Sequence, residues 1–151
     1  RITSFFFVLP RRNSFHAKNR LRTDVISSYK LVNVFIMDDF DTPIFKKSYD
    51  LYRQLHELRI KVAKQDRHTL WQRLENNALS VIEGILRASA MTKDEKLPTL
   101  QAVSHDLNVA RVFIRLAKDT KVIDIGKYED FQSQVDEIGR MLGGWIKQVK
   151  S

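Results

Sequence analysis

The chain contains no cysteine among its 151 residues. Disulfide bonds and thiolate metal sites are therefore excluded, and the composition is compatible with a reducing, cytoplasmic location. Glycine and proline are also scarce, with five and three residues respectively. Because turns depend on these two residue types, their scarcity favours long helices over a turn-rich β architecture. No apolar run approaches the roughly 18 residues of a membrane-spanning helix, so we expect no membrane partner.

The motifs of several enzyme classes are missing as well. No His-Glu-x-x-His zinc pair, no Glu-x-x-His pair of di-iron bundles and no glycine-rich phosphate loop occurs. The Arg-x4–6-His spacing of helical ribonucleases of the HEPN type is not found in residues 37–151. We therefore expect a protein that is not an enzyme and that has no catalytic residue, no metal ligand and no cofactor.

The positive charge is concentrated at the beginning of the chain. The net charge is +8, but residues 1–36 hold seven Lys/Arg and one acid, hence +6. Residues 37–151 hold the other 19 basic and 17 acidic residues, hence +2. A charge argument for nucleic-acid binding by the whole domain is thus weaker than the total suggests.

Residues 1–36 differ in composition from the rest and form the first of two predicted units. Their short apolar run stops at Pro10 and lacks the length and the cleavage site of a secretory signal. Three interpretations stay open: a segment upstream of a natural start at Met37, a flexible basic tail that touches nucleic acid, or a folded part of the domain. The second unit, residues 37–151, is the predicted helical domain.

Four helical segments follow, recognised by apolar residues at helical spacing. Thr42 and Pro43 suit the start of the first, which we expect to end at Lys64-Gln65. Asp66 is the expected cap of the second, with Trp71 at the edge of its apolar face and Gly84 at a close contact. The charged residues Thr92 to Lys96 are expected to connect the second segment to the third, near whose start Pro98 lies. Asp124 is the expected cap of the fourth, which continues to Val149.

These short connections force neighbouring helices to run antiparallel. The predicted fold class is therefore all-α, an up-down-up-down four-helix bundle.

The third helical segment carries a row of basic residues on one face. Arg111, Arg115 and Lys118 follow one another at i, i+4 and i+7, and Lys121 comes just beyond. Such a row can neutralise successive phosphates of a nucleic acid. Arg73 and Arg140 could add to it from neighbouring helices. The alternative is a solvated basic face interleaved with acids. No aromatic row accompanies it, so base stacking is not indicated.

The last helical segment contains three glycines near its end: Gly139, Gly143 and Gly144. Each one costs roughly 1 kcal/mol relative to alanine in a helix interior. With Trp145 they predict close packing, since glycine lets another backbone or a large side chain approach. The partner is either a neighbouring helix or a second subunit, and the sequence leaves both open.

Three stretches resemble the Avd (accessory variability determinant) proteins of diversity-generating retroelements. Pro43 to Tyr52 is similar to the opening helix of that family, and Arg115 to Asp119 to the end of its third helix. The most specific stretch is Asp136-Glu137-Ile138-Gly139-Arg140-Met141-Leu142-Gly143-Gly144-Trp145-Ile146. The similarity covers roughly residues 43–148 and excludes residues 1–36.

The resemblance implies a bundle that assembles into a barrel-shaped homopentamer. It also implies RNA and DNA binding, and association with the reverse transcriptase that copies the template-repeat RNA into cDNA during mutagenic retrohoming. It carries no short binding motif, so the choice of Arg111, Arg115, Lys118, Arg73, Lys121 and Arg140 rests on spacing alone. The alternative is a related four-helix protein of ribosomal RNA intervening sequences, with an RNA-binding or structural role and no reverse-transcriptase partner.

Overall fold

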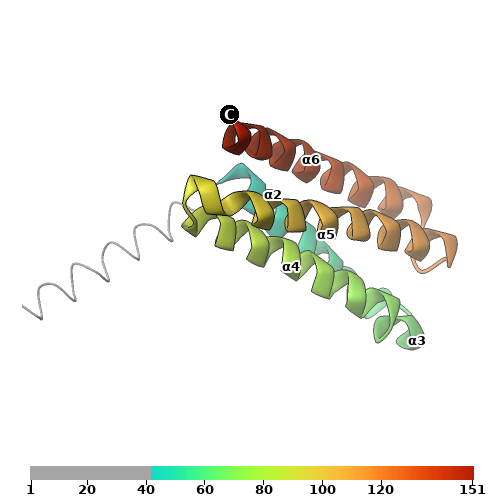
Figure 1. The fold of residues 1–151 in the computed structure, drawn as a ribbon. Helices are drawn as coiled ribbons and strands as arrows, with labels where there is room; N and C mark the ends of the chain where they lie inside the picture. The colour runs from blue at the N-terminus through green and yellow to red at the C-terminus, as the bar shows by residue number, and fades with distance from the viewer. Residues whose placement is uncertain (1–41) are drawn as a thin grey trace, which may run out of the picture. The chain divides into compact units, whose positions relative to one another are not determined.

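The structure, a computed structural model, describes residues 42–151, which form helices joined by short connections (Figure 1). The four long helices are α2 (Pro43–Leu58), α4 (Leu70–Ala90), α5 (Lys93–Asp119) and α6 (Ile125–Lys150). Two short helices, η1 (Arg59–Lys61) and α3 (Lys64–Arg67), lie between α2 and α4. No strand occurs in these residues, which confirms the all-α prediction.

The four long helices pack together as a bundle. Helix α4 contacts α2 and α5, and α6 contacts α5 and α2. Successive long helices run in opposite directions, as Figure 1 shows. The three interpretations of residues 1–36 lie outside the described residues, and the homo-oligomer remains a prediction.

The core is built from the apolar positions that recur at helical spacing on each long helix. This spacing puts the side chains of one face on top of one another, and burying that face is the main source of stability of such helices. The largest fully buried side chains are Trp71, Phe131, Leu55, Leu74, Ile85, Leu100, Leu107, Ile114, Ile138 and Leu142.

Two sequence predictions about local structure are confirmed. The Lys127 backbone N–H donates a hydrogen bond of 2.8 Å to Asp124 Oδ1, so Asp124 caps the start of α6. A Cβ atom on Gly84 would collide with Cγ2 of Val103. The missing side chain at Gly84 therefore allows α4 and α5 to approach closely.

The prediction for Trp71 was wrong, because this residue lies in the core and not at the edge of the apolar face. It is 0% exposed. Its Nε1–H donates a hydrogen bond of 3.2 Å to the backbone carbonyl of Leu55 on α2. A buried indole N–H needs such an acceptor, so this bond joins the start of α4 to the end of α2.

Helix boundaries between α2 and α4 also differ from the predictions. Helix α2 ends at Leu58 instead of reaching Lys64-Gln65, and Val62 has an extended backbone. The Arg67 guanidinium donates to the carbonyls of Ile60 and Val62, which satisfies acceptors freed by the end of the helix. Asp66 lies inside α3, and Thr69 instead precedes α4.

The predicted charged connection from Thr92 to Lys96 is helical from Lys93 onward. Thr92 Oγ1 lies 2.9 Å from Glu95 Oε2, and Asp94 and Glu95 lie in the first turn. Acidic side chains there interact favourably with the helix dipole, and a Thr-x-x-Glu sequence is a common helix start. Pro98 is consequently inside α5, on its exposed side.

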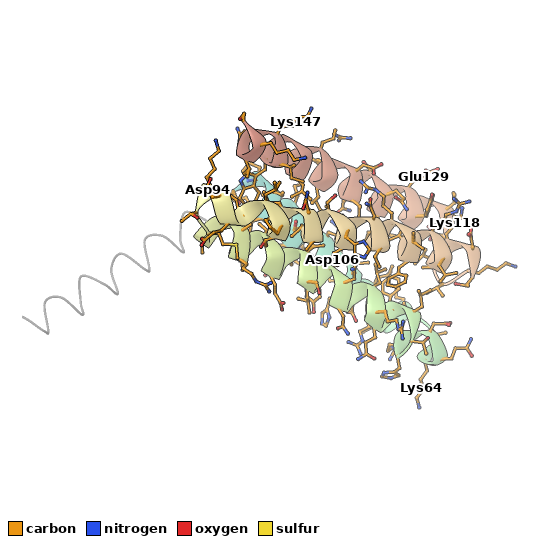
Figure 2. The ribbon with its side chains drawn as sticks, viewed as in Figure 1. Lys64, Asp94, Asp106, Lys118, Glu129 and Lys147 are labelled. Carbon is orange, nitrogen blue, oxygen red and sulfur yellow. The ribbon has the colours of Figure 1, made fainter. Side chains whose placement is uncertain are left out.

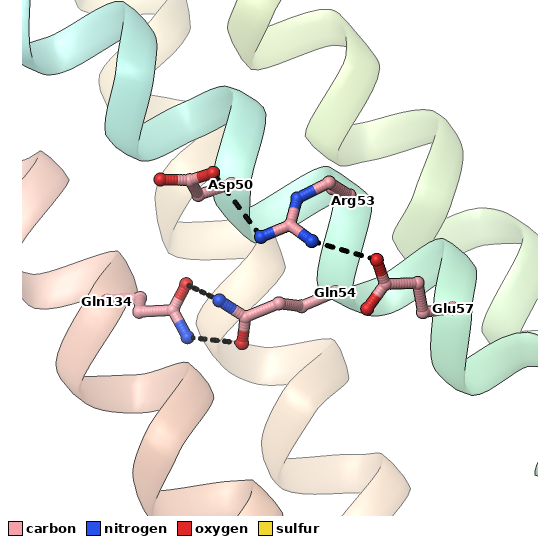
Figure 3. A network of polar contacts seen from close by, with 5 residues as sticks. All are labelled: Asp50, Arg53, Gln54, Glu57 and Gln134. Carbon is pink, nitrogen blue, oxygen red and sulfur yellow. Dashed lines mark hydrogen bonds and ion pairs between the residues drawn. The ribbon is translucent and has the colours of Figure 1, made fainter.

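Polar side chains fix α2 against α6. The amides of Gln54 and Gln134 exchange two hydrogen bonds, of 3.3 and 2.9 Å (Figure 3). On the exposed side of α2, Arg53 lies between Asp50 and Glu57. The paired amides satisfy each other across the helix boundary, so their partial burial carries little penalty.

Glu75 is a buried acid that the sequence reasoning missed. Its side chain is 4% exposed, and its carboxylate lies 3.2 Å from Arg59 Nη1 and 3.1 Å from His56 Nδ1. A buried carboxylate needs such partners, because removing a charge from water is costly. His56 is exposed and Arg59 is partly exposed, so both partners keep access to water.

This arrangement predicts an asymmetry between two substitutions. Arg59→Met leaves the Glu75 carboxylate buried with only His56 beside it, and should lower the free energy of unfolding by about 2 kcal/mol. Glu75→Met leaves both partners in contact with water and should cost less than about 1 kcal/mol. Urea denaturation followed by helical circular dichroism measures both, with Lys64→Met as an exposed control. Equal losses for the two variants would contradict the prediction.

Candidate nucleic-acid interface

The predicted basic row lies on α5, and its members differ in how much of their charge is neutralised. Arg115 is the most accessible, with 72% of its side chain exposed, and its Nε lies 3.8 Å from Asp119 Oδ2. Lys118 Nζ lies 3.3 Å from Asp119 Oδ1 and 4.5 Å from the centre of the Tyr128 ring. Figure 2 shows Lys118 near the end of α5 that adjoins the start of α6.

Arg111 is engaged within the bundle. Its Nε lies 2.9 Å from Asp136 Oδ1 on α6, and its Nη1 donates a 2.7 Å hydrogen bond to Asn108 Oδ1. Its backbone carbonyl accepts a hydrogen bond from Gln132 Nε2. Its side chain is 32% exposed. Arg111 therefore joins α5 to α6, and its charge is less available to a ligand than spacing alone suggests.

The three additional basic residues are exposed. Lys121 follows α5 in a left-handed backbone conformation, with φ of 59°. Arg73 and Arg140 form no ion pair with any residue in 42–151. Arg140 is brought close to the row, because it lines a hollow of about 340 Å³ together with Arg111, Asp136 and Gly139. No hydrogen bond or ion pair within the described bundle joins Arg73 to the row.

The glycines of α6 differ in their surroundings. A Cβ on Gly139 would lie 2.7 Å from Nη2 of Arg111, so this glycine makes room for the guanidinium. A Cβ on Gly143 or Gly144 would meet nothing within 4 Å. Close packing within the described part of the chain therefore accounts for Gly139 alone. Contact of Gly143 and Gly144 with a second subunit remains a prediction.

Trp145 is half-buried at the other end of α6 from Asp124. Its ring has Lys96 Nζ above it, 5.6 Å from the ring centre. The sequence reasoning missed Lys96, which it assigned to a connection. The signal that could have found it is Thr92-x-x-Glu95, since a helix start there puts Lys96 in the first turns of α5.

The structure contains no group of three or more His, Cys, Asp or Glu that could hold a metal ion among the residues it describes. No helix of this part of the chain is long and apolar enough to cross a membrane. One Arg-x4-His spacing of the ribonuclease type does occur in the sequence, from Arg11 to His16, but both residues lie outside the described range.

Residues 43–149 match the model of the bAvd-like family. The chain belongs to this family. The match extends over all four long helices, which agrees with the resemblance drawn from residues 43–148. Family membership suggests an accessory-type protein of diversity-generating retroelements, of a kind that is generally not catalytic. No curated protein and no solved structure matches the chain.

The surroundings of Gly139 predict a specific effect of Gly139→Ala. Alanine should gain about 1 kcal/mol of helix propensity, but its Cβ displaces the Arg111 guanidinium. The coupling free energy between Arg111 and Asp136, which we expect to be about 0.5 kcal/mol for a partly exposed pair, should fall as the guanidinium shifts. A double-mutant cycle in urea, repeated in the Gly139→Ala background, measures this. An unchanged coupling energy would contradict the packing argument.

Gly143→Ala is the matched variant, because nothing within the described chain meets its added Cβ. It should raise the free energy of unfolding of the isolated chain by about 1 kcal/mol. If Gly143 lies at a contact between subunits, the same substitution should weaken assembly, as measured by sedimentation velocity across a concentration series. A variant that is neither more stable nor altered in assembly would speak against both roles.

Proposed function

We propose that the chain is a non-enzymatic accessory protein of a diversity-generating retroelement. In this role it binds RNA and cDNA and associates with the reverse transcriptase of the element during mutagenic retrohoming. The observation that carries the proposal is the family match over residues 43–149, which includes every long helix of the bundle. The proposal includes a cytoplasmic location.

Nucleic-acid binding is supported by basic side chains that are exposed and little neutralised. Arg115 extends from α5 with most of its side chain in solvent, and Arg140 has no ion-pair partner among residues 42–151. Such side chains contact phosphates, which gives affinity without base readout. We therefore expect Arg115, Arg140, Lys121 and Arg73 to contribute more than Lys118, and Lys118 more than the engaged Arg111.

A homo-oligomer, expected to be a pentamer, is part of the proposal. Val112 and Leu116 lie one turn apart on α5, and Val112 is 63% exposed. Large apolar side chains exposed side by side are typical of contact surfaces between proteins. Together with the open position at Gly143, they are the surfaces that we expect other subunits to cover.

The proposed partnership predicts a stable complex with the reverse transcriptase encoded beside this gene. The full chain should co-purify with that enzyme at moderate salt after nuclease treatment, because a protein contact does not depend on bridging RNA. An unrelated reverse transcriptase is the control. Loss of the complex after nuclease treatment would indicate that RNA alone links the two proteins. No complex with folded protein would favour an intervening-sequence type of function.

The phosphate contacts predict how salt dependence should change. Replacing Arg115 and Arg140 together by Gln should weaken single-stranded RNA binding and reduce the slope of log K against log salt by about 0.7 for each lost contact. Lys64→Gln, on the far side of the bundle from α6, is the matched charge control (Figure 2). Fluorescence anisotropy over a salt series measures the slope. An unchanged slope with an intact fold would mean that these side chains are only solvated.

A further inference from the structure

A hollow lies at one end of the bundle, where α2 and α5 begin and α6 ends. Its volume is about 580 Å³. It is lined by Pro43 of α2, Lys96 of α5, and Arg140, Gly144, Trp145 and Gln148 of α6, among others. Helices α5 and α6 thus bring an aromatic ring and two basic side chains to one place, and the start of α2 completes the wall.

The hollow is positively charged. Lys96 and Arg140 line it, and no carboxylate of the described residues does. Neither cation forms an ion pair within the described bundle. The row on α5 differs in this respect, since Arg111 and Lys118 already have Asp136 and Asp119 as partners. The end hollow is therefore complementary to an anion.

The aromatic ring at this place is partly open to the hollow. Trp145 is half-buried and packs against the core, and a Cβ on the neighbouring Gly144 would meet nothing within 4 Å. The Lys96 ammonium is 5.6 Å from the ring centre, near the outer limit of about 6 Å for a cation–π contact. Because this contact is long and the Lys96 side chain is flexible, a ligand can easily replace it. A planar group of the ligand would then lie on the Trp145 ring, and an anionic group would contact the Lys96 ammonium.

We propose that this hollow binds one nucleotide of a single-stranded RNA or DNA, with its base stacked on Trp145 and the adjacent phosphates on Lys96 and Arg140. The assignment rests on the proposed function and names a site for it. An aromatic face beside basic side chains is the combination that single-strand binding uses. A neutral apolar ligand would leave both cations unused, and a duplex already has its bases stacked on each other.

Arg140 connects this hollow to the basic row. It lines the end hollow with Trp145 and also the neighbouring hollow with Arg111. A strand bound at Trp145 can therefore continue past Arg140 into the neighbouring hollow. Arg140 is thus the cation that the two hollows share.

Tryptophan fluorescence of the full chain tests the proposal. The chain has two tryptophans, and Trp71 is fully buried, so quenching by a stacked base reports on Trp145. A single-stranded oligouridine of six nucleotides should quench the emission as it binds. An abasic oligomer of the same length and charge should bind at least about fivefold more weakly and should not quench.

Substitutions distinguish binding at this hollow from nucleic-acid binding elsewhere on the protein. Trp145→Leu should abolish quenching and weaken oligouridine binding at least about fivefold by anisotropy, while leaving the affinity for the abasic oligomer unchanged. Lys96→Gln should reduce the salt slope by about 0.7, and Lys64→Gln should change nothing. Circular dichroism checks that each variant is folded, and Lys96→Gln tests the site even where Trp145→Leu does not fold.

Three results would overturn the assignment. Oligouridine that binds without quenching, and equally to Trp145→Leu, would leave the proposed function standing and remove this site. Quenching by an acidic peptide but not by oligouridine would assign the hollow to a protein partner. Absence of any binding to RNA or single-stranded DNA would overturn both this assignment and the nucleic-acid part of the proposed function.

Discussion

The bundle depends on the junction at which α4 begins against the end of α2. Trp71 is fully buried there, and its indole N–H requires an acceptor, which the Leu55 carbonyl provides. One turn later on α4, Glu75 is held by Arg59 and His56. These contacts fix the direction in which the chain reverses. Helix α4 then approaches α5 at Gly84, and Arg111 joins α5 to α6, so each later helix is positioned by the one before it.

The sequence predicted this architecture well where the signal is local. Apolar residues at helical spacing identify all four long helices, and Asp124 caps α6 as its position suggests. It failed at Trp71 and Asp66, because the boundary there is set by contacts with α2 that a linear pattern does not contain. It also failed at Thr92 to Lys96, where charged residues were interpreted as a loop although their order favours the start of a helix.

The candidate site was predictable only in part, for a related reason. Spacing on one helix predicts that Arg111, Arg115 and Lys118 share a face, but it cannot indicate which acids lie opposite. Asp136 is 25 residues from Arg111, yet it neutralises that guanidinium. Likewise, Trp145 has the spacing of a core residue. It does pack against the core, but it also lines the end hollow with residues from α2 and α5, which are distant in sequence.

The cations of the bundle thus fall into two groups with different physical roles. Those that face an acid on another helix, such as Arg59 and Arg111, hold the fold together, and substituting them tests stability first. Those without an acid partner among residues 42–151, such as Lys96 and Arg140, contribute little to packing.

The glycines of α6 also fall into two groups. Gly139 makes room for the Arg111 guanidinium. Gly143 and Gly144 each cost α6 about 1 kcal/mol with no packing gain within the described chain. A glycine lets another molecule approach the helix closely, and Gly144 precedes Trp145, which lines the end hollow. The proposed nucleotide contact at Trp145 gives a reason for the open position at Gly144, which packing within the described bundle does not supply.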